Sequence, residues 1–357
     1  MSEKLGAIKK FRAFADIGRT QGITVTASVA ICGALSSTAN VYWYHIVYFT
    51  LIAIFYHTVL NTYIAKGDVY LDSKTYVPER NPLINCKLKE KEARGYVYFG
   101  TIIFFILTIP FFFTSGYDLK FVLPTFLCLL LSYIWLIWYG YNGKKMVFSY
   151  DFSFSVSWIF LVLFGVFAVG GAPTRYTLFF ILVTIFATTA FAQWENGLKD
   201  VDADRAAGVK SLAVLTNVKS GKKLGFHPYL IYGTGLKICF LFSCLLAYFV
   251  YKNIYYLLFV LGYGVSSQTF ILWRFAVKEK PIEHRKTILF DVTLSSILIY
   301  SVIFGKIGII LVVLLIIYLI VGYLIGSALQ SECEFKFRRF SGENMETNNI
   351  SGEDNHD

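Results

Sequence analysis

The sequence predicts an all-α protein, a polytopic bundle of transmembrane helices. Of its 357 residues, 56% are hydrophobic and only 16% are charged, and the mean hydropathy is +0.57. A soluble domain of this composition would leave a large apolar surface in water, so a membrane protein is favoured. The chain also contains repeated apolar runs, each long enough to cross a hydrocarbon core of about 30 Å.

Ten apolar runs are candidates for membrane spans, although a buried or re-entrant segment is the alternative for any one of them. They cover residues 22–38, 42–63, 96–115, 120–140, 152–171, 175–194, 229–251, 254–273, 287–304 and 307–328. The chain therefore divides into an amphipathic N-terminal segment (1–21), a transmembrane domain (22–328) and a polar, disordered tail (329–357). In the tenth run, Gly322 and Gly326 have the GxxxG spacing of a helix-packing face. That spacing alone does not support an oligomer.

Basic residues are distributed asymmetrically about these spans. The N-terminal segment, the loops after even-numbered spans and the C-terminal tail hold 28 of the 33 Lys and Arg residues. Because cytoplasmic loops retain an excess of Lys and Arg, both termini and these loops are predicted to be cytoplasmic. Lys237 falls inside the seventh span. Its side chain either snorkels to the cytoplasmic edge or has a functional position, paired or facing a cavity.

The net charge of +10 reflects the same topological bias and does not indicate a nucleic-acid partner. In the N-terminal segment, four apolar residues at helical spacing lie beside basic ones: Leu5, Ile8, Phe11 and Phe14 beside Lys9, Lys10 and Arg12. Such a helix is predicted to lie in the membrane interface, in contact with membrane lipids.

Two cytoplasmic loops, 64–95 and 195–228, are longer than the others and open with the same acidic pattern. The first contains Asp68 and Asp72 in GDVYLD, and the second contains Asp200 and Asp204 in KDVDAD. On a helix, residues i and i+4 share one face, so each pair presents two carboxylates in one direction. Two such charges repel each other unless a cation lies between them. Mg²⁺ binds one or two protein carboxylates together with water and substrate phosphate oxygens, so the four aspartates are predicted to hold Mg²⁺ on a diphosphate.

Basic side chains near both pairs are candidate contacts for that diphosphate. They are Lys199, Arg205, Lys210, Lys144 and Arg80. The positive-inside bias accounts for any single one of them, but topology needs no aspartates, so acids and bases together indicate a phosphate site.

The stretch DVDADRAAGVKSLAVL resembles the second aspartate-rich motif of the UbiA superfamily of intramembrane prenyltransferases. In that motif DxxxDxxxG is followed by a basic residue and a turn containing Ser or Thr. The matching positions are Asp200, Asp204, Gly208, Lys210 and Ser211. The first loop, DVYLDSKTYVPERNPL, is similar to the first motif, with Arg80 and Pro82 separated by one residue.

The first loop also departs from the family pattern. Where the family has Asn four residues before the first aspartate, this chain has Ile64, and Tyr76 occupies the usual third acidic position. Asn61, on the same helical face as Asp68, is the candidate replacement, whereas Asn196 stands four residues before Asp200. The resemblance implies a fold of nine transmembrane helices, so the tenth span is an additional C-terminal helix.

The resemblance implies Mg²⁺-dependent transfer of a polyprenyl group from an allylic polyprenyl diphosphate to a lipophilic acceptor, with release of diphosphate. It implies that Asp68, Asp72, Asp200 and Asp204 are the catalytic metal ligands. The donor contacts would be Lys199, Arg205, Lys210, Lys144, Arg80, Asn61 and Asn196. An aromatic or quinone precursor is the favoured acceptor; an isoprenoid glycerol phosphate of an archaeal-type ether lipid and a carotenoid are the alternatives.

Two other classes of membrane protein also use buried or paired charges. A transporter of an anionic substrate would place them near the midplane at broken helices, whereas the aspartate motifs lie beyond the cytoplasmic ends of the spans. A membrane phosphatidyltransferase has its motif glycine upstream of later aspartates, whereas here Gly208 follows both. An enzyme of the prenyltransferase type is therefore the favoured class.

Overall fold

The computed structural model describes residues 2–73, 81–85, 87–114, 118–142, 149–219, 222–279 and 281–330. These residues form helices and connecting turns, with no strand among them, which confirms the all-α prediction. The N-terminal half contains α1 (Ser2–Ile17), η1 (Thr20–Gly22), α2 (Ile23–Ser36), α3 (Trp43–Gly67), α4 (Val69–Asp72), α5 (Glu90–Ile106), α6 (Ile109–Thr114), α7 (Leu119–Asn142) and α8 (Ser149–Ala168). The C-terminal half contains α9 (Arg175–Thr189), η4 (Ala190–Glu195), α10 (Asn196–Ala206), α11 (Leu212–Leu215), α12 (Pro228–Leu246), α13 (Tyr248–Tyr251), α14 (Ile254–Phe259), η5 (Val260–Gly264), α15 (Val265–Val277), α16 (Pro281–Ser301) and α17 (Phe304–Leu329).

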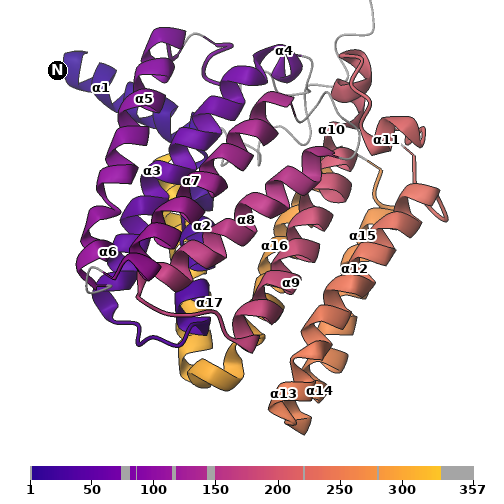
Figure 1. The fold of residues 1–357 in the computed structure, drawn as a ribbon. Helices are drawn as coiled ribbons and strands as arrows, with labels where there is room; N and C mark the ends of the chain where they lie inside the picture. The colour runs from indigo at the N-terminus through magenta and orange to yellow at the C-terminus, as the bar shows by residue number, and fades with distance from the viewer. Residues whose placement is uncertain are drawn as a thin grey trace, which may run out of the picture.

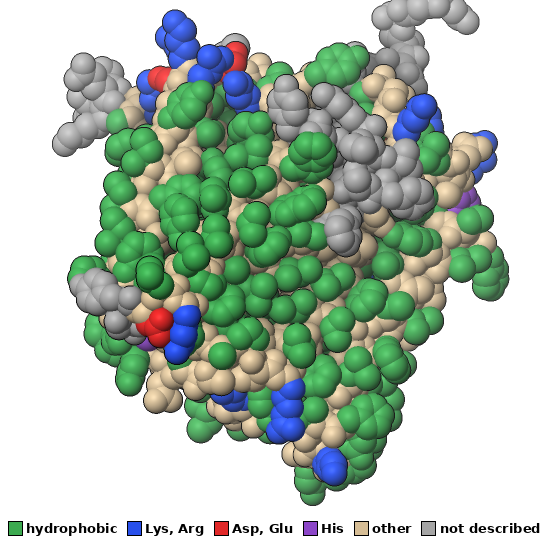
Figure 2. All heavy atoms as spheres, in the orientation of Figure 1, with side chains coloured by type: hydrophobic (Ala, Val, Ile, Leu, Met, Phe, Trp, Pro, Cys, Tyr) green, Lys and Arg blue, Asp and Glu red, His purple; other side chains and the backbone are tan. Residues whose placement is uncertain are grey.

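Helices occupy all ten ranges expected to cross the membrane (Figure 1). Seven helical stretches are long and apolar enough to span it: Trp43–Gly67, Glu90–Phe113, Leu119–Gly140, Arg175–Ala206, Pro228–Tyr251, Ile254–Val277 and Phe304–Leu329. Figure 2 shows hydrophobic side chains over most of one face, with Lys and Arg side chains at its two ends. This distribution is that of an integral membrane protein, because an apolar belt is stable in hydrocarbon and the charged ends are stable in water.

Several helices extend beyond the apolar runs that predicted them. The sixth run does not end in a loop after Trp194, because the helix continues through η4 into α10. Similarly, α16 begins at Pro281, six residues before the apolar run expected from residue 287. Hydropathy marks only the part of a helix that suits lipid, whereas backbone hydrogen bonding continues into the polar part.

The helices α2 and α8 cross with their backbones in close contact. A Cβ atom built on Gly165 would lie 1.9 Å from the carbonyl oxygen of Ala30, and one built on Gly33 would lie 2.2 Å from that of Val162. Small residues allow transmembrane helices to approach this closely and gain dispersion energy, which replaces the hydrophobic effect inside a bilayer.

We expect Gly165→Ala to destabilise the protein by about 1–3 kcal/mol, because the clash is with backbone and the helices must separate. The midpoint of thermal unfolding in detergent measures this effect. Gly95→Ala in α5 is the matched control, since a Cβ atom there meets nothing within 4 Å. An equal loss of stability in both variants would contradict the close crossing of α2 and α8.

The C-terminal helix α17 packs against the N-terminal part of the chain. Its Gly322 faces the side chain of Thr24, and Gly326 faces the backbone of Thr20 and Gln21. The Thr20 hydroxyl also donates a hydrogen bond of 2.7 Å to the Gly326 carbonyl. The predicted GxxxG packing face is therefore used within the chain.

The N-terminal helix α1 packs with one side against the bundle. Ala13 and Ile17 are buried, and Lys10 forms an ion pair of 2.5 Å with Glu92. Ile8 and Phe11 remain exposed beside the basic residues of the helix. The exposed side thus keeps the amphipathic character expected of an interfacial helix.

Candidate metal and diphosphate site

The first aspartate pair lies where α3 ends and the short helix α4 begins. Asp68 is the C-cap of α3, and the backbone N–H of Asp72 donates a 2.7 Å hydrogen bond to the Asp68 carbonyl. This bond joins residues i and i+4, so the helical spacing predicted for the pair is present. Asn81 Nδ2 donates to Asp72 Oδ2 at 2.8 Å and to the Ala65 carbonyl at 3.0 Å. Asn81 thus ties the start of the following loop to this carboxylate.

The second aspartate pair lies on α10, which continues the sixth spanning helix beyond η4. Asp200 and Asp204 are one helical turn apart on this helix, and Asp204 is only 6% exposed. Lys199 Nζ lies 3.4 Å from Asp200 Oδ2. The structure therefore places an ammonium group directly beside one of the two carboxylates.

The fold brings the two motifs to the same end of the bundle. Cα atoms of α4 and α10 approach within 8 Å of each other, although more than 120 residues of chain separate the two helices. Figure 1 shows α4, α10 and α11 at one end, opposite α6, α13 and α14. The paired loops predicted from the sequence are thus neighbours in space.

Gly208 of the second motif ends α10. Its φ angle is +72°, in the left-handed region that favours glycine. The N–H of Val209 donates to the Asp204 carbonyl at 2.8 Å, and the N–H of Gly208 donates to the Arg205 carbonyl at 3.2 Å. These two bonds form a Schellman C-cap, which satisfies carbonyls at the helix end. The glycine therefore reverses the chain one turn after the second aspartate.

We expect Gly208→Ala to cost about 1–2 kcal/mol of stability, since a Cβ atom strains a left-handed backbone even where space is open. Thermal unfolding measures this loss. Gly235→Ala in α12, where the glycine backbone is helical and a Cβ atom also meets nothing within 4 Å, should not destabilise the protein. A stable Gly208→Ala protein would show that the C-cap does not require this conformation.

The other predicted donor contacts have different surroundings. Asn61 Nδ2 donates to the His57 carbonyl at 2.8 Å, and Asn196 is the half-buried first residue of α10. Arg205 lies 3.5 Å from Asp202 and donates to the Val218 carbonyl, so its guanidinium joins α10 to the segment after α11. Lys210 is exposed. Arg80 and Lys144 lie outside the described residues.

Aspartate oxygens and Asn amides are hard ligands suited to Mg²⁺. Within the described part of the chain, no three His, Cys, Asp or Glu side chains group closely enough to hold a metal by themselves. Mg²⁺ normally takes only one or two protein carboxylates and keeps water and substrate phosphate as its other ligands. Two adjacent aspartate pairs therefore fit Mg²⁺ bound together with a diphosphate.

A π-helical turn, η4, immediately precedes α10. The Tyr229 hydroxyl lies 2.7 Å from the Gln193 carbonyl and 2.8 Å from the Trp194 carbonyl of this turn. Gly197 and Gly233 make room for this contact, because a Cβ atom on Gly197 would lie 2.3 Å from the Tyr229 hydroxyl and one on Gly233 would lie 2.0 Å from the Trp194 ring. The π-helical turn before the motif helix is thus in contact with α12.

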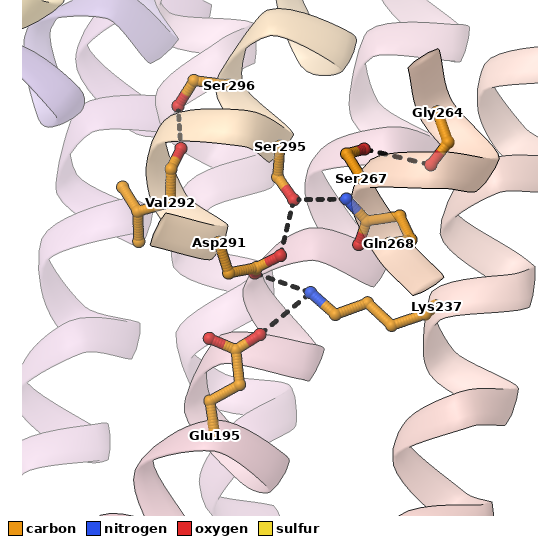
Figure 3. A network of polar contacts seen from close by, with 9 residues as sticks. All are labelled: Glu195, Lys237, Gly264, Ser267, Gln268, Asp291, Val292, Ser295 and Ser296. Atoms are coloured by element: carbon orange, nitrogen blue, oxygen red, sulfur yellow. Dashed lines mark hydrogen bonds and ion pairs between the residues drawn. The ribbon is translucent and has the colours of Figure 1, made fainter. Parts of the chain in front are cut away.

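Lys237 does not snorkel to the membrane edge, so that alternative is wrong. The residue is 2% exposed, and its Nζ lies 2.9 Å from Glu195 Oε1 and 2.6 Å from Asp291 Oδ2 (Figure 3). Glu195 and Asp291 were not predicted to have a role. A signal was present, because Asp291 is the only charged residue of the ninth run and an acid there needs a partner.

The sequence matches the UbiA prenyltransferase family over residues 23–297. The chain belongs to this family. The resemblance inferred from the aspartate motifs is therefore confirmed, as is the prediction of a membrane prenyltransferase. The matched region ends within α16, so α17 lies beyond it. No functionally curated protein matches the sequence.

Solved structures of UbiA homologues share the fold. A digeranylgeranylglyceryl phosphate synthase is 17% identical, with a TM-score of 0.60 over 84% of this chain and 99% of that one. A UbiA homologue from Archaeoglobus fulgidus, bound to GPP and Mg²⁺, is 17% identical, with a TM-score of 0.58 over 83% and 100% of the two chains. A homologue from Aeropyrum pernix K1 is 15% identical, with a TM-score of 0.57 over 76% and 98%. At these identities the likeness establishes the fold.

Proposed function

We propose that this UbiA-family protein transfers a polyprenyl group from an allylic polyprenyl diphosphate to a lipophilic acceptor and requires Mg²⁺. The observation that carries the proposal is the approach of α4, which ends at Asp72, to α10, which carries Asp200 and Asp204. Asp68, Asp72, Asp200 and Asp204 would hold the metal. An A. fulgidus homologue with this fold binds GPP and Mg²⁺, which supports the same donor class and metal here.

Bound Mg²⁺ would neutralise the diphosphate as it departs. Lys199 on α10 and Lys210 beyond the C-cap would add positive charge on the same side, with Lys144 and Arg80 as further candidates. Asn61 and Asn196 would orient the donor through their side-chain amides. In the reaction the allylic C–O bond breaks, its electrons leave with the diphosphate, and a nucleophilic atom of the acceptor bonds to the allylic carbon and loses a proton.

The apolar bundle would protect the reactive prenyl chain. The allylic cation left by diphosphate departure reacts with water, and buried aromatic and aliphatic residues of α2, α3, α8 and α9 exclude water from the membrane side. The lipid-soluble tail would lie in this apolar region while the charged head stays at the bundle end. By the distribution of Lys and Arg, that end and both termini face the cytoplasm.

For the acceptor, we propose an aromatic or quinone precursor. One of the described basic side chains of the second motif is engaged within the chain, since Arg205 contacts Asp202 and the Val218 carbonyl, which leaves fewer cations for a second phosphate. This supports one diphosphate rather than two phosphorylated substrates. An isoprenoid glycerol phosphate is the competing acceptor, since a digeranylgeranylglyceryl phosphate synthase has the same fold.

The decisive experiment supplies purified protein with labelled farnesyl or geranylgeranyl diphosphate, Mg²⁺ and a panel of acceptors. The panel contains aromatic acids, quinone precursors, an isoprenoid glycerol phosphate and a carotenoid. Diphosphate release together with a product whose mass equals acceptor plus prenyl group supports the proposal and identifies the acceptor. Movement of an anionic substrate across proteoliposomes without diphosphate release would instead establish a transporter.

A further inference from the structure

A cluster of charged and polar side chains lies inside the C-terminal half of the bundle. Lys237 on α12 binds Glu195 of η4 and Asp291 of α16. The Ser295 hydroxyl donates to Asp291 Oδ1 at 3.0 Å, and Gln268 Nε2 on α15 donates to the Ser295 oxygen at 3.1 Å. These side chains come from η4, α12, α15 and α16, and Figure 3 shows them pointing toward one another. All five residues are buried.

Apolar side chains lie on both sides of this ionic cluster. Along α12, Lys237 lies between Tyr229 and Phe240, which belong to two different apolar clusters. Along α16, Asp291 likewise lies between Ile288 and Leu298 of the same two clusters. The charges are therefore enclosed within the bundle and do not form part of its polar surface.

Stability alone is a poor explanation for such a cluster. Two carboxylates bind one ammonium group, and the Glu195 Oε2 atom is buried with no hydrogen-bond partner in the described part of the chain. Removing these charges from water costs free energy that ion pairing does not fully return, so apolar residues of similar volume would serve stability as well or better. We therefore explain the cluster by the backbone geometry that it fixes in the helices it joins.

That geometry bears directly on the second aspartate motif. Glu195 is the last residue of η4, and Asp200 follows five residues later on α10. A π-helical turn contains one residue more than an α-helical turn, and one residue rotates an α-helix by about 100°. If η4 relaxed to an α-helix, the faces carrying Asp200 and Asp204 would rotate by that angle relative to α4.

We propose that Lys237 is a positioning residue for the second aspartate pair. By pairing with Glu195 and Asp291 it fixes the π-helical turn and so directs Asp200 and Asp204 toward the first motif. Tyr229 assists from the same helix by binding the carbonyls of the turn. This inference rests on the proposed function, because it assumes that the aspartates bind a metal with diphosphate.

The test measures metal binding separately from catalysis. Mn²⁺ is titrated into the full-length protein in detergent with inorganic diphosphate, and free Mn²⁺ is followed by its electron paramagnetic resonance signal. The variants are Lys237→Met and the uncharged triple variant Glu195→Gln/Lys237→Met/Asp291→Asn. Lys306→Met, at the exposed start of α17, is the matched Lys→Met control. The thermal midpoint is recorded for each protein.

We expect Lys237→Met to lower both the thermal midpoint and the Mn²⁺ affinity, because it leaves two buried carboxylates without their cation. The triple variant should regain the thermal midpoint but still bind Mn²⁺ about tenfold or more weakly, the effect typical of losing a group that orients metal ligands. Glu195→Gln keeps the side-chain shape and should also weaken binding. If the other variants do not fold, the Mn²⁺ affinity of Glu195→Gln decides the test.

A triple variant with wild-type Mn²⁺ affinity would overturn the inference, since the cluster would then serve stability only. If Glu195→Gln is the only variant that folds, a wild-type Mn²⁺ affinity in that variant would also overturn the inference. Asp200→Asn separates this failure from failure of the proposed function. If Asp200→Asn binds as much Mn²⁺ as the wild-type protein, the metal site itself is refuted, and the inference is refuted with it.

Discussion

Replacing Asp200 by alanine is expected to abolish prenyl transfer, lowering the rate by at least about 100-fold while the protein remains folded in the membrane. The effect on the rate should be large because the carboxylate would bind the cation that neutralises the departing diphosphate. The effect on stability should be small because Asp200 is 33% exposed and its ion pair is with the adjacent Lys199. Diphosphate release and the thermal midpoint measure the two effects.

The control for this experiment is Asp202→Ala on the same helix. Asp202 is 54% exposed and pairs with Arg205 at 3.5 Å. It carries the same charge as Asp200 but projects from a different face of α10, since the two are two residues apart. The control should retain most of the transfer rate. Undiminished transfer by the Asp200 variant would refute the assignment of the second motif.

Removal of divalent metal is expected to have the second large effect on prenyl transfer. Chelation with EDTA should abolish transfer by the wild-type protein, and added Mg²⁺ should restore it, because the aspartate pairs repel each other and the diphosphate without a cation. Diphosphate release over a Mg²⁺ titration measures the effect.

The first motif can be tested with the same titration. Asp72→Asn should raise the Mg²⁺ concentration needed for half-maximal transfer, although Asn81 would still hydrogen-bond an amide oxygen at that position. The thermal midpoint serves as the control for folding. Transfer that persists in EDTA would contradict a role for metal in either motif.

Much of this site was predictable because its parts are local in sequence. The i and i+4 spacing of Asp200 and Asp204 needs only a helix, and α10 provides one. Gly208 could be placed in the motif from its spacing, and the structure shows its physical role as a C-cap with φ of +72°. Its role follows from backbone sterics, which depend on the residue itself.

The ionic cluster was not predictable in the same way. Lys237 was visible in the sequence as a charge inside a span, yet its two partners lie 42 and 54 residues away. Pairing at such separations depends on which helices are neighbours and how each is rotated. Hydropathy contains no information on rotation, so snorkelling and pairing could not be distinguished without the packed bundle.

The sequence by itself determined the membrane class, the approximate positions of the helices and the spacing of the two aspartate pairs, because none of these needs contact between distant segments of the chain. Only the tertiary structure decided that α4 lies beside α10, that α17 packs on α2 through its glycines and that a π-helical turn held by α12 directs the second motif. These features arise from contacts between distant segments, and each depends on side chains meeting at a few ångströms.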